Sequence, residues 1–155
     1  MLRHFTGTYD HKMDDKGRVS LPTEFRRVLD AVGSSGALYI VPMLENADSH
    51  VVFTIEAYSK LIERHNEAEY PSRKHQQRME SKLVKRAIQV QVDDMGRIVV
   101  NKTLREAIGL EKQVVFVGLA SSFEIWNPDA HEAFEADLAE DEADDPVFID
   151  RRGLH

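Results

Sequence analysis

The sequence Asp-Asp-Lys-Gly-Arg-Val at residues 14–19 returns 79 residues later as Asp-Asp-Met-Gly-Arg-Ile at residues 93–98. The surrounding segments 13–26 and 92–105 align without a gap, and both close on an aromatic or aliphatic residue followed by arginine. Chance can produce one short match of this kind, but it rarely produces matching flanks as well. The chain therefore contains an internal duplication, and both copies are expected to adopt the same local fold.

The flanks of each copy predict a strand, a tight turn and a second strand. Residues 88–92 alternate strictly between apolar and polar side chains, which is typical of a half-buried strand, and residues 6–9 form a weaker strand pattern. Apolar or β-branched runs follow at residues 19–21 and 98–100. The glycine of each copy lies between the two strands, where it accepts a positive φ at little steric cost. Each copy thus predicts a hairpin-like element.

A short helix and two further strands are expected after each hairpin. The helices should end near Gly33 and Gly109, because glycine is the usual residue after a helix C-terminus. One copy of about 45 residues is too small to bury a stable core alone, whereas two copies can share one. The further strands are predicted at residues 37–41 and 51–55 in the first copy, and at 113–117 and 123–126 in the second.

These patterns predict an α+β fold in which two β-rich units share a core. The first unit takes residues 8–55 and the second takes residues 84–127. A helical connector is expected at residues 56–83, and a C-terminal helix with an acidic tail at residues 128–155. Within that last segment we expect the helix to run from about 129 to 138, followed by a disordered or loosely attached stretch at 140–146 that is rich in acidic residues.

The charge distribution is uneven along the chain. The formal net charge is −7, but residues 129–155 hold 10 acids and 2 bases, whereas residues 1–128 hold 17 acids and 18 bases. Residues 73–86 carry six bases against a single acid. A local field of this kind affects phosphate binding more than the sum over the chain does. For residues 73–86, a phosphate-facing helix, a solvated face and a contact with acidic residues at a subunit interface all stay open.

The duplicated segment resembles a known class of DNA-binding domain. Residues 14–26, Asp-Asp-Lys-Gly-Arg-Val-Ser-Leu-Pro-Thr-Glu-Phe-Arg, are similar to the strand–turn–strand of the AbrB/SpoVT/MazE-like swapped-hairpin domains. The two-copy arrangement, the Met-Leu-Arg-x-Phe start, Val-Phe-Val-Gly at 115–118 and Phe-Glu-Ile-Trp at 123–126 resemble the bacterial MraZ family over about residues 1–138. The fold implied is two AbrB-like swapped-hairpin units with connecting and C-terminal helices.

The resemblance also implies a function. MraZ proteins are transcriptional regulators of the division and cell-wall gene cluster, which form rings and bind repeated boxes upstream of their own operon. Double-stranded DNA and further copies of the chain are then the partners, and the protein is expected to be cytoplasmic and nucleoid-associated. The family's signature falls on Asp14 and Arg18, and again on Asp93 and Arg97. Met95 stands where the first copy has a lysine, which makes the second copy the weaker DNA contact.

The chemistry of these side chains agrees with DNA binding. The planar guanidinium of Arg18 or Arg97 can pair bidentately with guanine in the major groove, which a two-stranded β-ribbon can enter. Lys16 would contact phosphates. Arg3, Arg26 and Arg27 lie near the first turn in sequence, and both phosphate contact and ordinary surface placement stay open for them. Asp14 and Asp93 would orient the arginines or fold the turns. The plainer alternative is that both aspartate–arginine pairs only stabilise turns. The predicted DNA-binding residues are Arg18, Lys16, Arg97, Asp14, Asp93 and Arg3.

The motifs of other functional classes are missing from the sequence. Adjacent aspartates point to opposite faces of a strand, and the histidines show no metal-ligand spacing. We therefore expect no enzyme, no metal, no cofactor, no small-molecule substrate and no membrane segment. Two alternatives from other classes stay open: an antitoxin-like protein that binds a toxin through its acidic tail, and a structural ring without a DNA role.

Overall fold

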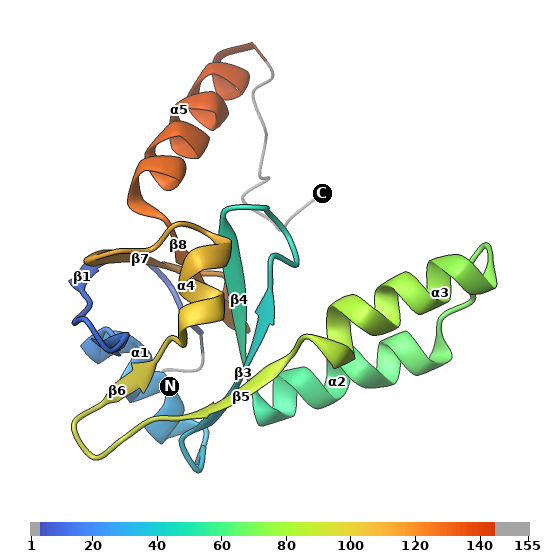
Figure 1. Ribbon diagram of the computed structural model, residues 1–155, viewed down its shortest axis with the longest axis horizontal. Helices are drawn as coiled ribbons and strands as arrows, with labels where there is room; N and C mark the ends of the chain where they lie inside the picture. The colour runs from blue at the N-terminus through green and yellow to red at the C-terminus, as the bar shows by residue number, and fades with distance from the viewer. Residues whose placement is uncertain (1–3, 145–155) are drawn as a thin grey trace, which may run out of the picture.

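The duplication organises the architecture of the protein (Figure 1). The computed structural model describes residues 4–144, and side chains as far as Asp141. The first copy supplies β1 (Thr8–Lys12), β2 (Arg18–Ser20), α1 (Thr23–Ala31), β3 (Ala37–Pro42) and β4 (Ser49–Thr54). The second supplies β5 (Ile88–Gln91), β6 (Arg97–Val99), α4 (Lys102–Ala107), β7 (Gln113–Gly118) and β8 (Ser122–Trp126). Between and after them lie α2 (Ile55–Glu67), α3 (Arg73–Glu80), the π-helical turn η1 (Ser81–Lys85) and α5 (Pro128–Asp144).

The two copies exchange their first strands. The main sheet has six antiparallel strands in the order β1-β7-β8-β4-β3-β5, so β1 lies against the second copy and β5 against the first. The exchange is symmetric, because the pair Asp10–Val115 in one half corresponds to the pair Gln89–Tyr39 in the other. This confirms the expected fold of two swapped-hairpin units with a shared core.

The element predicted as a hairpin is more open than its sequence suggested. Between β1 and β2 there is one isolated bridge, Met13–Val19, rather than a ladder. Strand β2 pairs instead with its counterpart β6, and Val19 lies opposite Ile98 at the centre of this two-stranded ribbon. Both central side chains are buried, because the ribbon covers the core. The burial of this inner face, rather than local pairing, therefore determines where β2 lies.

The core is built from both copies. Phe25 of α1 packs against Phe116 of β7 and Phe123 of β8, with ring centroids 6.3 and 4.8 Å away. Phe5 joins the same cluster at 5.3 Å from Phe25, and all four rings are buried. Neither copy would retain this aromatic cluster on its own.

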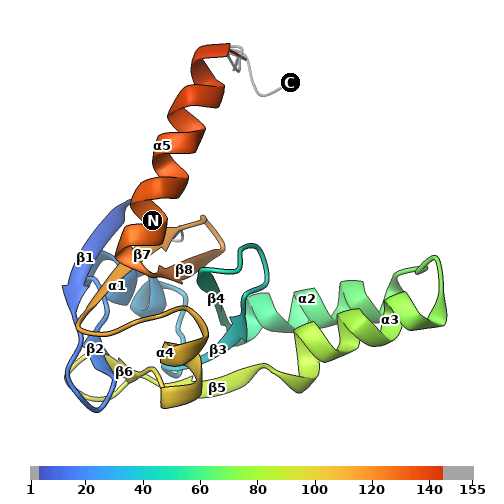
Figure 2. The same cartoon turned by 45° about the horizontal axis from the view of Figure 1, so that its top comes forward.

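Two helical segments project from the body in different directions (Figures 1 and 2). One is the α2–α3 hairpin, which reverses near Pro71 and in which the Tyr58 hydroxyl donates to the carbonyl of Leu83 at 2.8 Å. The other is α5. No helix within residues 4–144 is long and apolar enough to cross a lipid bilayer.

Helix α5 corrects the prediction for the acidic C-terminal segment. The helix continues to Asp144. The prediction that an irregular stretch begins at residue 140 was therefore wrong for residues 140–144. Asn127 caps the start of the helix by accepting from the backbone N–H groups of Asp129 and Ala130, and Trp126 packs on Phe134 at 5.0 Å. Alanine and glutamate are strong helix formers, which explains the continuation past the capped and packed first turns. The rest of the acidic tail lies outside the described residues.

Candidate nucleic-acid interface

The outer face of the β2–β6 ribbon gathers the residues singled out in the sequence. Side chains alternate between the two faces of a strand. Because Val19 and Ile98 point into the core, their neighbours on both strands point outward. The cross-strand pairs on this outer face are Arg18 with Val99 and Ser20 with Arg97.

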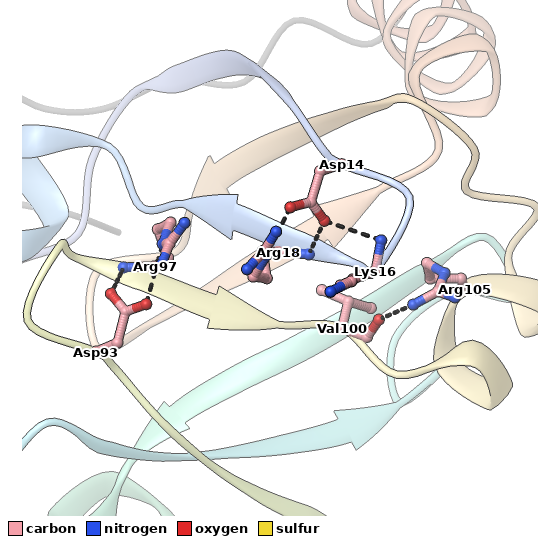
Figure 3. Close-up of polar contacts among 7 residues, drawn as sticks. All are labelled: Asp14, Lys16, Arg18, Asp93, Arg97, Val100 and Arg105. Atoms are coloured by element: carbon pink, nitrogen blue, oxygen red, sulfur yellow. Dashed lines mark hydrogen bonds and ion pairs between the residues drawn. The ribbon is translucent and has the colours of Figure 1, made fainter.

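Each arginine is oriented by the aspartate four residues before it (Figure 3). Oδ1 of Asp14 accepts from the backbone N–H groups of Lys16 at 3.0 Å and Arg18 at 2.9 Å, while Oδ2 accepts from Arg18 Nε at 2.6 Å. Asp93 repeats this arrangement, since its carboxylate bonds the N–H of Met95 and both the N–H and Nε of Arg97. One carboxylate thus closes the turn and fixes the guanidinium above it.

The ion pair leaves the two terminal nitrogens of each guanidinium available. Of the three guanidinium nitrogens only Nε is bonded to the aspartate, and within residues 4–144 the terminal Nη atoms of Arg18 and Arg97 make no hydrogen bond. The side chains are 41% and 30% exposed, respectively. The turn-stabilising and DNA-reading interpretations therefore do not exclude each other, because they use different nitrogens of the same guanidinium.

Hydrogen bonds keep both aspartates ionised. The backbone N–H of Arg18, with its side chain next, lowers the pKa of Asp14 below its ordinary value. The backbone N–H of Arg97 is likewise the main cause of a lowered pKa at Asp93. Both carboxylates are therefore charged at neutral pH, so each turn carries an aspartate–arginine pair rather than an unopposed positive charge.

The turns are held by the opposite copy. The carbonyl of Gly17 accepts from the N–H of Val100 at 2.8 Å, and the carbonyl of Gly96 accepts from Leu21 at 2.9 Å. Both glycines have positive φ, 83° and 76°. A Cβ on Gly17 would lie 2.2 Å from the Val100 carbonyl oxygen, so the conformation and the close approach both require glycine.

Two arginines that close the repeated segments contribute to this contact. Arg105 donates from Nη1 to the Val100 carbonyl at 2.6 Å (Figure 3). Its side chain also lies next to Gly17, and that of Arg26 lies next to Gly96. Both positions are the matching ends of the repeat. Arg26 was a candidate for phosphate binding, whereas Arg105 was not among the expected site residues. Their equivalence under the 79-residue offset was the available sign that they hold a structural position in both copies.

The remaining predicted residues are spread over different environments. Lys16 is exposed at the tip of the first turn, and Met95, at the same position of the second, is 66% exposed. Arg27 is paired with Glu24 at 2.8 Å on α1. Arg3 lies outside the described residues.

The basic segment 73–86 lies away from the ribbon. It follows α3 and η1 along the projecting hairpin, on the side of the body away from β6 in both views and away from β2 in Figure 2 (Figures 1 and 2). The segment therefore does not extend the surface that carries Arg18 and Arg97. Within the part of the chain that the structure describes, no three histidine or acidic side chains come together as a metal site.

Comparison with known proteins gives matches that include both turns. A family model described as "MraZ protein, putative antitoxin-like" matches residues 4–34 and 83–149. A transcriptional regulator MraZ of Parvibaculum lavamentivorans is 35% identical over 133 residues, which cover 86% of this chain and 81% of the relative. The protein of that name from Ruegeria pomeroyi is 33% identical over 94% of this chain and 90% of its own length. One from a further Ruegeria strain is 32% identical over 99% of both chains.

Proposed function

Because the chain belongs to the MraZ family of transcriptional regulators, we propose that it binds double-stranded DNA in a sequence-specific manner through the outer face of the β2–β6 ribbon. The observation that carries this proposal is the pair of aspartate-oriented arginines on one outward surface. A two-stranded β-ribbon fits the major groove, where guanine presents O6 and N7 to a guanidinium.

The residues of the ribbon have different roles in the proposed DNA binding. Arg18 and Arg97 read guanine edges with their free Nη atoms. Lys16 contacts phosphate, which adds affinity without reading sequence. Asp14 and Asp93 do not contact DNA favourably, because a carboxylate repels phosphate, so their part is to orient the arginines.

The proposed targets are repeated boxes upstream of the division and cell-wall gene cluster. One ribbon offers few base contacts, so specific binding by one chain should be modest. Several chains in a ring would place ribbons on successive boxes, and the later contacts would then become effectively intramolecular. We therefore propose that the protein acts on DNA repeats as a homo-oligomer, and that it does so in the cytoplasm at the nucleoid.

Two oppositely charged projections support assembly of this kind. The α3–η1 surface carries the bases Arg73, Lys74, Arg78, Lys82, Lys85 and Arg86. Helix α5 carries the exposed acids Glu132, Glu135, Asp137, Glu140 and Asp141. Since the two surfaces differ, contact between them is head-to-tail, and head-to-tail contacts generate rings when the rotation closes.

The direct test of DNA recognition is Arg18→Ala in a gel-shift assay with the DNA upstream of the protein's own gene. We expect loss of specific binding with an unchanged circular dichroism spectrum, because the side chain is outward-facing and partly exposed. Arg64→Ala on α2 is the matched control, since this arginine is exposed and lies outside the ribbon. A folded Arg18→Ala protein that still prefers the same sequence would contradict the proposal.

An antitoxin-like role is the second candidate, favoured by the family description and by the acidic C-terminal helix. In that case the acidic segment would bind a basic toxin partner. Expression together with the neighbouring genes, followed by purification, tests this candidate. A small basic protein recovered in a fixed ratio would favour it, and recovery of the chain alone would count against it.

A further inference from the structure

The two copies differ on the surface of the ribbon, although their backbones are equivalent. Position 20 of the first copy is serine, and its equivalent in the second copy is Val99. Ser20 is exposed, and Val99 is 49% exposed. The outer face therefore presents an apolar side chain in one half where it presents a hydroxyl in the other.

The strand register joins each of these residues to the arginine of the other copy. Val99 lies opposite Arg18, and Ser20 lies opposite Arg97. Side chains directly opposite one another on antiparallel strands have Cβ atoms about 4.5–5.5 Å apart. The ribbon thus consists of two half-faces: Arg18 with Val99, and Arg97 with Ser20.

These half-faces suit different bases. Successive bases of a DNA strand are about 3.4 Å apart, so a side chain beside Arg18 lies over a base pair next to the one that the arginine reads. In the major groove an apolar side chain contacts the 5-methyl group of thymine, whereas a serine hydroxyl bonds to several bases. Arg18 and Val99 together therefore fit a guanine followed or preceded by a thymine.

We propose that Val99 is a specificity-determining residue that contacts a thymine methyl group beside the guanine read by Arg18, and that the chain therefore recognises an asymmetric box in one orientation. This inference rests on the proposed DNA-binding function. The pseudo-twofold relation of β2 and β6 alone would favour a palindrome. Replacement of serine by valine in one half-face removes that equivalence, so one chain distinguishes the two directions along the duplex.

The experiment begins with selection of a duplex from a random library by the wild-type protein. Each thymine of the selected duplex is then replaced by uracil, which removes only the methyl group. Each guanine is replaced by 7-deazaguanine, which removes the N7 acceptor. We expect one uracil substitution to weaken wild-type binding about three- to fourfold, the effect of losing one methyl contact. The same substitution should not affect binding by Val99→Ser. In Arg97→Ala, which retains Arg18, 7-deazaguanine at the guanine beside that thymine should still weaken binding.

The matched variant exchanges the two residues, Ser20→Val together with Val99→Ser. The apolar side chain then lies beside Arg97, so the methyl-sensitive thymine should move to the other half of the box. Both positions are exposed on the outer face, and a thermal melt checks that the fold is retained.

Failure of this inference is distinct from failure of DNA binding. If the selection yields no preferred sequence, the proposed function itself is wrong. If a preferred sequence is selected but contains no thymine beside the guanine of Arg18, Val99 does not have this role. A wild-type protein that is insensitive to every uracil substitution would overturn the inference. So would a Val99→Ser variant whose only change, by native mass spectrometry, is a smaller particle, because Val99 would then be a contact between copies.

Discussion

At the scale of single residues, one carboxylate both closes a turn and orients the arginine that we propose to read DNA. Asp14 closes its turn through two backbone N–H groups and holds Arg18 through Nε, and Asp93 does the same for Arg97. An aspartate at this position makes the arginine part of a rigid turn, so less side-chain entropy is lost when DNA binds. Because these bonds require an ionised carboxylate, they weaken when the aspartate is protonated at low pH.

The pH dependence follows from the lowered pKa of both aspartates. A carboxyl group whose pKa is lower in the folded than in the unfolded protein adds stability above the unfolded value, near 3.9, and that stability is lost as the pH falls through the folded value. We expect the turns to stay closed at neutral pH and to loosen only in strong acid. Carboxyl ¹³C titration by NMR measures this, and midpoints at or above the ordinary aspartate value would show that the turn bonds do not form in solution.

In the proposed complex with DNA, the residue at the tip of each turn determines whether that turn contacts phosphate. Lys16→Ala should weaken binding to all sequences alike and lower the slope of log K against log salt concentration by about one, because one phosphate contact is lost. Met95→Lys is the complementary variant and should raise the slope by about one, since Met95 is exposed at the equivalent position. Titrations at several salt concentrations measure both slopes. An unchanged slope for Lys16→Ala would remove Lys16 from the phosphate contacts.

At the scale of elements, the duplicated pattern predicted most of the secondary structure, but the partners of the strands came from the resemblance. Alternation at residues 88–92 predicted β5, which spans Ile88–Gln91 and so ends one residue earlier than predicted. Nothing local in that pattern shows that β5 pairs with β3 of the other copy. Strand pairing depends on residues far apart in the sequence, whereas periodicity reports only which face is buried.

The candidate site shows the same division between local and distant information. Asp14 and Arg18 are four residues apart, so their contact was accessible from the repeat and the family resemblance. The contact of Arg105 with the first turn joins residues 88 positions apart and depends on strand exchange. Helix α5 also ran further than expected, because acidic composition alone does not distinguish a solvated helix from an irregular chain.

The contact between each turn and the opposite copy gives a stability prediction. Gly17→Ala should cost about 1–2 kcal/mol for the left-handed backbone and about 1–3 kcal/mol more for the clash with the Val100 carbonyl. Gly33→Ala is the matched control, because Gly33 has a φ of 68° and open space around its Cβ position. Only the backbone cost applies there. Urea denaturation compares the two, and equal losses of unfolding free energy would contradict the close approach at Gly17.

At the scale of the whole molecule, the two charged projections predict how copies meet. Reversal of charge on the α3–η1 surface, Arg78→Glu with Lys85→Glu, should reduce the native particle to smaller species. Addition of Glu135→Lys and Glu140→Lys in the same chain should restore it, because the complementary surface is then reversed as well. Lys102→Glu on α4 is the control, since this lysine is 80% exposed and lies on neither projection. Light scattering gives the particle mass, and an unchanged mass after the first reversal would exclude this contact.

The exchange of strands within one polypeptide has a consequence at low abundance. A strand-swapped pair made from two separate chains dissociates on dilution, and its two arginines are then no longer next to each other. Here residues 56–87 tie the halves together, so Arg18 and Arg97 remain neighbours at any concentration. Because one chain encodes both halves, the two halves need not have the same sequence. A mutation in the second turn is therefore not accompanied by the same mutation in the first.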